Sequence, residues 1–175
     1  AKTVMFDEMT PSIIMAGFPM LDWIDIAMSP VCLPGEVDQN ANIMYVDAAE
    51  RMGLAADVCP LPSAEVGCAI VDDYPQVGSS FITSSMPCDG SLGAALFMDR
   101  YMKKLPSFTL TPPQRFNEPE TNAYAVKDLK NCIRFIEETY DVKWDWDAFW
   151  KKAEEYNKTT QCMLDKWDVN CTPYP

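Results

Sequence analysis

Residues 81–90 read FITSSMPCDG, and the change of character along this stretch decides the fold class. Its first half is apolar and then small, which predicts a buried strand. Proline and glycine make the second half a sharp loop, and residues 91–104, rich in Ala, Leu and Met, predict a helix after it. Residues 107–111 predict the next strand. Strands that alternate with helices indicate an α/β protein with a parallel sheet.

The sequence before this stretch begins with the same alternation. Residues 2–6 predict a strand, and residues 12–17 predict a short helix that ends at Gly17. Residues 18–42 contain several prolines, so we expect a loop there with one short strand at residues 24–28.

Two further helices are expected before residue 81. Residues 43–52 have helical spacing, and Gly53 stands where a helix C-cap would. Pro60 and Pro62 predict a loop over residues 57–62. Ser63 is a natural N-cap, so the next helix is predicted over residues 63–71.

The pattern changes after Pro119. Residues 121–140 and 146–168 predict two long helices, with Asp145 as the N-cap of the second. We therefore predict an α/β domain over residues 1–119 and a helical segment over residues 120–175. The two helices are expected to pack on each other or on the α/β domain, through Tyr124, Ile133, Ile136, Phe149 and Trp150.

Composition excludes several classes of protein. The chain has 175 residues and is 48% hydrophobic, which suffices for a domain with its own core. Its net charge of -12 repels phosphate backbones, so nucleic-acid binding is not expected. We find no basic amphipathic stretch, no cleavable apolar leader and no apolar run that could span a bilayer, so no membrane association is expected. We expect a cytoplasmic protein.

Seven cysteines and the absence of histidine narrow the possible chemistry. No CxxC pair is present, which excludes a zinc ribbon or a thioredoxin-type motif. A chain that can build its own core does not need a disulfide scaffold. We therefore interpret the cysteines as free thiols, some of which are metal ligands. Without histidine, any chemistry must come from cysteine, carboxylates, hydroxyls, backbone amides or a cofactor.

Cys59 and Cys88 are the candidate metal ligands. Each lies in a proline-containing loop that precedes an expected helix. In parallel sheets, the loops at the carboxyl ends of the strands build the ligand site, and helix N-termini favour thiolates and anionic clusters. The alternative is that both cysteines are small apolar fillers, because free cysteine is commonly buried.

The other cysteines have less informative surroundings. Cys68 and Cys132 lie on expected helices and are predicted to be structural. Cys162 and Cys171 flank the end of the last helix, where a ligand role has no support from the pattern. Cys32 lies in a proline-rich loop, and its role stays open.

Three polar residues near the cysteine loops are candidates for catalysis. The hydroxyls of Ser84 and Ser85, or the adjacent amides, could contact the carbonyl of an acyl thioester, although the sequence pattern favours a role for both residues in forming the turn. Glu65 follows the Cys59 loop closely and could serve as an acid or a base.

Several short motifs, taken together, resemble the 2-hydroxyacyl-CoA dehydratase and benzoyl-CoA reductase family. Residues 84–90, SSMPCDG, look like its strand–loop cysteine motif, and residues 56–60, ADVCP, are similar to the cysteine motif that precedes it. The intervening DDYP at residues 72–75 keeps the expected spacing. Further on, FIEETY at residues 135–140 and Asn157 follow the family's helical pattern, so the likeness spans nearly the whole sequence.

The resemblance implies a fold and a cofactor. A family subunit has two flavodoxin-like α/β domains joined by helices, and a [4Fe-4S] cluster is held between them by three cysteines. Cys59 and Cys88 match the two ligands from the first domain. The third belongs to a second domain, which this sequence does not include, so we expect a fragment or one piece of a split subunit. Cys162 or Cys171 could substitute, although neither has a matching strand–loop context.

The resemblance also implies a reaction and partners. In dehydratases, the acyl-CoA thioester becomes a ketyl radical anion that expels the hydroxyl group, whereas benzoyl-CoA reductases reduce an aromatic ring. Two related subunits pair as a heterodimer, and an ATP-dependent iron–sulfur activator protein injects one electron. We predict a radical dehydratase subunit. The alternatives are a ring-reductase subunit and a non-catalytic iron–sulfur electron-transfer or accessory protein.

Overall fold

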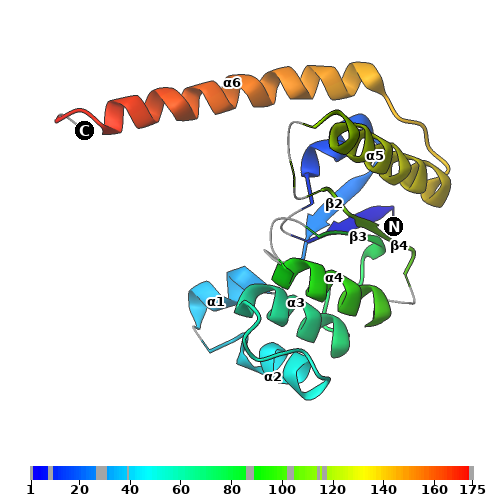
Figure 1. Cartoon of the computed structure of the whole chain (residues 1–175), viewed down its shortest axis with the longest axis vertical. Coiled ribbons are helices and arrows are strands. Elements are labelled where there is room, and N and C mark those ends of the chain that lie inside the picture. Colours follow the sequence, from blue (N-terminus) through cyan, green and yellow to red (C-terminus); the bar gives the residue numbers. More distant parts are fainter. Residues whose placement is uncertain are drawn as a thin grey trace. The chain divides into compact units, whose positions relative to one another are not determined.

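A computed structural model describes residues 2–7, 10–26, 31–38, 40–85, 89–101, 105–113, 115 and 118–173. Its centre is a four-stranded sheet in the order β2-β1-β3-β4, and each neighbouring pair is parallel (Figure 1). The strands are β1 (Thr3–Phe6), β2 (Asp22–Asp25), β3 (Gly78–Ser84) and β4 (Ser107–Leu110). The predicted α/β fold with a parallel sheet and two long C-terminal helices is confirmed.

The burial of each strand follows from its place in the sheet. β1 is buried along its whole length and β3 from Ser80 onward, because both strands are central. A strand that is covered on both faces needs an unbroken run of apolar or small residues. Such runs are VMF at residues 4–6 of β1 and FITS at residues 81–84 of β3. β2 is an edge strand and is more exposed, and it begins with the charged residue Asp22.

Helices cover the sheet on both faces. The described helices of the whole chain are the 3₁₀ helix η1 (Ser12–Gly17) and the α-helices α1 (Leu33–Val37), α2 (Ile43–Arg51), α3 (Pro60–Ile70), α4 (Asp89–Tyr101), α5 (Pro119–Tyr140) and α6 (Trp146–Asn170), and those that cover the sheet are among α1 to α5 (Figure 1). Figure 1 shows α1 to α4 on one side of the sheet and α5 on the other. The steps from β2 to β3 and from β3 to β4 run in the same direction, so right-handed crossovers place α3 and α4 on one face.

The main core lies between the sheet and the layer of α2, α3 and α4. Met5 and Phe81 of the sheet, Val66 of α3 and Met98 of α4 are almost fully buried within it. α2 and α3 come very close at Gly67, where an added Cβ would lie 1.8 Å from the carbonyl oxygen of Tyr45. Only a residue without a side chain allows this approach of the two helix backbones.

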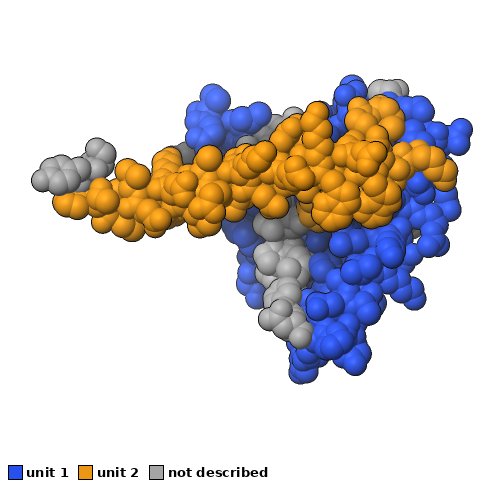
Figure 2. All heavy atoms as spheres, turned by 90° about the horizontal axis from the view of Figure 1, so that it is seen from above, with its two compact units in different colours: residues 1–10, 21–142 blue, residues 11–20, 143–175 orange. Residues whose placement is uncertain are grey.

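The chain divides into two compact units, coloured separately in Figure 2. The first consists of residues 1–10 and 21–142 and contains the sheet with α1 to α5. The second consists of residues 11–20 and 143–175 and contains η1 and α6. The domain boundary predicted at residue 119 stays a prediction.

The second unit is held together by aromatic contacts near the start of α6. The rings of Phe18 and Trp144 meet edge to face, with their centroids 5.2 Å apart. The backbone N–H of Asp145 donates to the carbonyl of Gly17 over 2.9 Å, and the Asp145 side chain caps α6 by accepting from the N–H of Ala148, as predicted.

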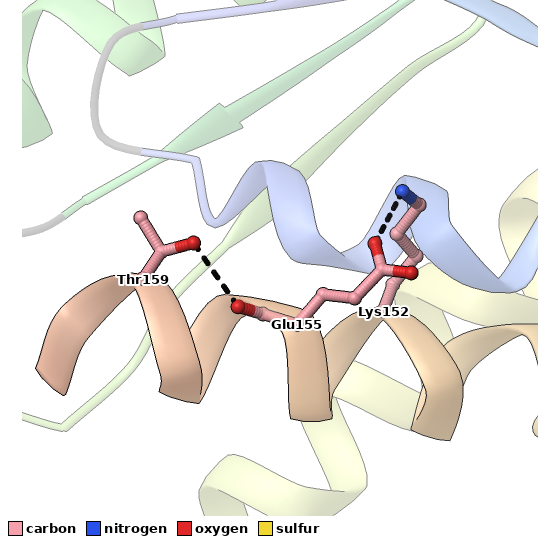
Figure 3. A network of polar contacts seen from close by, with 3 residues as sticks. All are labelled: Lys152, Glu155 and Thr159. Atoms are coloured by element: carbon pink, nitrogen blue, oxygen red, sulfur yellow. Dashed lines mark hydrogen bonds and ion pairs between the residues drawn. The ribbon is translucent and has the colours of Figure 1, made fainter. Parts of the chain in front are cut away.

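Beyond its first turns, α6 is a solvated helix with no buried residue. Figure 3 shows its polar contacts: the Lys152 ammonium lies 2.6 Å from the Glu155 carboxylate, and the Thr159 hydroxyl donates to the Glu155 carbonyl over 3.1 Å. The ion pair and hydrogen bond with Lys152 lower the pKa of Glu155. None of the described helices is long and apolar enough to cross a membrane.

Three expectations about local structure were wrong. The helix expected at residues 63–71 begins at Pro60, because proline lacks only an N–H that the first helical turn does not need. Residues 33–37 form the short helix α1 inside the expected loop. The strand expected at residues 24–28 is β2 (Asp22–Asp25), and residues 27 and 28 lie outside the described part of the chain.

The predicted packing of the last two helices is confirmed only in part. Ile136 is fully buried, and Ile133 and Phe149 are half-buried. Trp150 is exposed, so it was wrongly expected to be a packing residue. Tyr124 is also exposed, but its hydroxyl lies 2.8 Å from the hydroxyl of Thr111, just after β4. Helical spacing identifies an apolar stripe, but it does not show that another element covers the stripe.

Candidate functional site

The strand order places a ligand site at one particular point of the sheet. From β1 the chain crosses to β2 on one side, whereas β3 and β4 follow on the other side. The order therefore reverses between β1 and β3. In open parallel sheets, ligands bind beyond the carboxyl ends of the strands at such a switch point.

A buried carboxylate occupies this switch point. Asp7 directly follows β1 and is 5% exposed. Its side chain accepts hydrogen bonds from the Thr10 hydroxyl over 2.6 Å, from the Thr83 hydroxyl and from the backbone N–H of Ser84 over 2.8 Å. Several donors thus satisfy a polar group that would otherwise be costly to bury.

Neither Asp7 nor Thr10 was predicted from the sequence as a site residue. The one local indication of a site was the acidic residue at position 7, which directly follows the predicted apolar strand. Its partners on β3 are 76 and 77 residues away in sequence, so no local pattern links them.

Ser84 and Ser85 lie at the carboxyl end of β3, as the sequence predicts, and both are buried. Their backbone N–H groups donate to Asp7 and to the carbonyl of Leu110, the latter over 2.9 Å. Both amides are therefore engaged within the sheet. The predicted contact of these residues with a thioester remains a prediction.

Cys59 is the N-cap residue of α3, and its side chain is exposed. An N-cap side chain usually accepts from the N–H of the second or third helical residue. Here the third residue is Pro62, which has no N–H, and the Cys59 side chain makes no cap hydrogen bond. The Ser63 hydroxyl instead donates to the backbone carbonyl of Cys59 over 2.9 Å. Cys59 is therefore an exposed cysteine at the positive end of a helix, with no cap hydrogen bond from its side chain.

The first turns of α3 and α4 lie at the same edge of the sheet. Both helices precede a parallel strand and run back across the sheet, so each begins at the carboxyl edge. They also pack against each other, as Figure 1 shows. Cys88 lies outside the described residues, and Asp89, the next residue in sequence, begins α4. The predicted closeness of Cys59 and Cys88 remains a prediction.

The other described cysteines are of three kinds, and the first is Cys32, which is half-buried. Burial raises the pKa of the Cys68 thiol to about 12, helped by the carboxylates of Asp73 and Glu65. Burial likewise raises the pKa of Cys132 to about 12. Both thiols are therefore protonated at neutral pH, and their predicted structural placement is confirmed. Cys162 and Cys171 are exposed.

Within the described ranges, no three Cys, Asp or Glu side chains gather into a group that could hold a metal ion. Because Cys88 lies outside those ranges, this result does not address the predicted pair. Glu65 lies on α3 and is 2% exposed, so its carboxyl group is sheltered from bulk water. Its role as an acid or base stays a prediction.

A hollow of about 480 Å³ lies beside the first turn of α3. Pro60 and Leu61, which follow Cys59 directly, form part of its wall together with Ala64 of the same helix, and the rest comes from α2, from Asn42 just before it, and from Val31 and Cys32 just before α1. It was not predicted from the sequence, because its walls come from segments about 30 residues apart.

The strand order defines a doubly wound α/β protein, and the polar groups at its switch point form a candidate ligand site at the carboxyl edge of the sheet. Residues 33–175 match the family of the 2-hydroxyglutaryl-CoA dehydratase D-component, and the chain belongs to that family. The resemblance to 2-hydroxyacyl-CoA dehydratases is thereby confirmed. A comparison with curated proteins found no match.

Proposed function

We propose that the chain is a subunit, or part of one, of a [4Fe-4S] 2-hydroxyacyl-CoA dehydratase, which removes water from a 2-hydroxyacyl-CoA through a one-electron ketyl radical mechanism. The observation that carries the proposal is the exposed thiol of Cys59, at the N-terminus of a helix and at the carboxyl edge of the sheet, in a chain of this family.

The chemistry of Cys59 fits an iron–sulfur cluster. Thiolates are the usual ligands of such clusters, and Cys59 is a free, exposed cysteine whose side chain does not cap its helix. The partial positive charge of the first turn of α3 favours an anionic ligand there. Cys59 and Cys88 would hold the cluster, with a third ligand supplied from elsewhere. When bound, a [4Fe-4S] cluster supplies single electrons.

Dehydration also requires proton transfer. A 2-hydroxyacyl group loses its hydroxyl as water and a hydrogen from the neighbouring carbon, so the site needs an acid and a base. The chain has no histidine, and we assign this role to the sheltered carboxyl group of Glu65. The hydroxyls of Ser84 and Ser85 would orient the thioester at the end of β3.

The overall reaction has no net change in oxidation state, so one electron supplied at the start can be recovered at the end. A reaction that needs only a starting electron is consistent with the partners that the family resemblance implies. They are a related second subunit and an ATP-dependent iron–sulfur activator that supplies the starting electron. The family match favours the dehydratase over an aromatic-ring reductase.

Anaerobic reconstitution with iron and sulfide tests the proposal. The wild-type chain is expected to become brown and to absorb at about 400 nm. Cys59→Ser should lower the bound iron at least about twofold. Cys162→Ser is the matched control, because Cys162 is also free and exposed but lies on α6, and it should leave the iron content unchanged. A colourless wild-type protein, or equal iron in both variants, would contradict the proposal.

A further inference from the structure

We propose that the hollow beside α3 receives the acyl chain of the substrate, and that it selects an uncharged acyl group over one ending in a carboxylate. This inference rests on the proposed function and extends it by naming the substrate class.

The hollow has the size and the position that such a role needs. Its volume of about 480 Å³ falls within the range of about 300 to 1,000 Å³ that is typical of ligand pockets. Pro60 and Leu61, the first two residues of α3, line the hollow and directly follow the exposed Cys59 in the chain. A thioester held near Cys59 could therefore extend its acyl chain into the hollow.

The walls of the hollow are mainly apolar. The apolar lining residues are Val31, Ile43, Val46, Pro60, Leu61 and Ala64. Part of the rim is fixed, because the Asn42 side-chain amide donates to the carbonyl of Val31 over 2.8 Å. Such a surface gains free energy by taking an alkyl or aryl group out of water.

The charge at the hollow disfavours a second carboxylate. Asp47 lines the hollow, and no Lys or Arg is among the described residues of its wall. The guanidinium of Arg51 lies 3.9 Å from the Asp47 carboxylate in an exposed ion pair, so that cation already faces a carboxylate of the chain. A substrate ending in a carboxylate would lose hydration and meet Asp47, with no cation in the wall to compensate.

Binding of two matched thioesters tests the inference. Pentanoyl-CoA and glutaryl-CoA have acyl chains of equal carbon number and differ in the terminal carboxylate, so the contribution of the CoA moiety cancels in the ratio of their Kd values. With the full chain under anaerobic conditions, calorimetry should show at least about tenfold tighter binding of pentanoyl-CoA. Ile43→Arg places a cation at the hollow and should reduce this ratio at least about fivefold.

Met44→Arg is the matched control. Met44 is the next residue on α2, is 57% exposed against 53% for Ile43, and does not line the hollow. The same charge added there should leave the ratio within about twofold of wild type. A second variant, Asp47→Asn, removes the carboxylate of the hollow without adding bulk and should also reduce the ratio.

The outcomes separate this inference from the proposed function. Equal or tighter binding of glutaryl-CoA by the wild-type chain would overturn the inference, as would equal effects of Ile43→Arg and Met44→Arg. Either result leaves the proposed function standing if the Cys59-dependent iron is present. If neither thioester binds, the inference fails, and the Cys59-dependent iron decides the proposed function separately.

Discussion

The carboxylate of Asp7 accepts a hydrogen bond from the backbone N–H of Ser84 over 2.8 Å, and this contact joins the carboxyl ends of β1 and β3. The same carboxylate accepts from the hydroxyls of Thr10 and Thr83. These bonds fix the end of β3 just before the segment that contains Cys88. A buried polar residue at the switch point thus connects the stability of the sheet with the geometry of the candidate site.

We expect Asp7→Asn to destabilise the chain by about 2 kcal/mol. The amide keeps the size of the carboxylate, but its NH₂ group would face a hydroxyl or an N–H that needs an acceptor, which leaves a buried donor unpaired. Urea unfolding followed by circular dichroism measures the change. Asp57→Asn, in an exposed loop, is the control and should alter the free energy of unfolding by less than about 0.5 kcal/mol. Equal stability of both variants would show that the network contributes nothing.

Tyr140 anchors the end of α5 to the sheet, and Tyr140→Phe should lower the free energy of unfolding by about 1 kcal/mol. Its hydroxyl lies 2.6 Å from the Ser80 hydroxyl and donates to the carbonyl of Thr3 over 3.1 Å, in a buried environment. Removal of the hydroxyl deprives the Ser80 hydroxyl of this buried partner, whereas the Thr3 carbonyl keeps its hydrogen bond from the Ser79 hydroxyl. Tyr156→Phe, on a residue that is 64% exposed, should have no measurable effect. The melting temperatures of both variants show whether the hydrogen bonds from Tyr140 to β1 and β3 stabilise the fold.

The parts of this fold that have a local period could be predicted from the sequence. β1, α2 and α5 were predicted to within one or two residues at each end, because short apolar runs and helical spacing are properties of adjacent residues. The start of α3 was placed three residues too late, because two prolines were taken to exclude a helix, although the first turn tolerates them.

The candidate site was only partly predictable, for a different physical reason. The positions of Cys59 at a helix start and of Ser84 at a strand end follow from local sequence. The bonds between Asp7 and β3 span more than 70 residues, and they exist only because the strand order brings β1 and β3 together. Composition carries no information about such pairs. The exposed Trp150 shows the converse limit, since spacing alone does not reveal what a helix packs against.

Stability should fall at alkaline pH. The folded pKa values of Cys68 and Cys132 are raised to about 12, chiefly by burial, from an ordinary value of 9.0. The folded state therefore favours the neutral thiols. Their contribution to stability is complete below pH 9.0 and is lost as the pH rises towards about 12, because the unfolded chain then ionises first. Each thiol can contribute a slope of up to about 1.4 kcal/mol per pH unit in that window.

The hydrogen bond from the Tyr45 hydroxyl to Asp73 adds to this effect, since it raises the pKa of Tyr45 from 10.0 to about 12. Urea unfolding between pH 7.5 and 11 measures the slope. Alkylation provides the independent check. At pH 8, iodoacetamide should label Cys59, Cys162 and Cys171 in the native chain, and Cys68 and Cys132 only after unfolding, as read by mass spectrometry. Rapid native labelling of Cys68 would contradict its raised pKa.

Two glycines on neighbouring helices should respond oppositely to the same substitution. Gly67 lies where α2 and α3 meet, and an added Cβ would lie 1.8 Å from the carbonyl oxygen of Tyr45, closer than backbone atoms tolerate. Gly67→Ala must therefore push the helices apart, and we expect a loss of at least about 3 kcal/mol or failure to fold. Gly93, on α4, has nothing within 4 Å of the same position. Gly93→Ala should stabilise the chain by about 0.5 to 1 kcal/mol, because alanine has the higher helix propensity. Melting temperatures of the two variants, measured side by side, test the close approach of α2 and α3. Equal tolerance of both substitutions would mean that the two helices do not meet at Gly67.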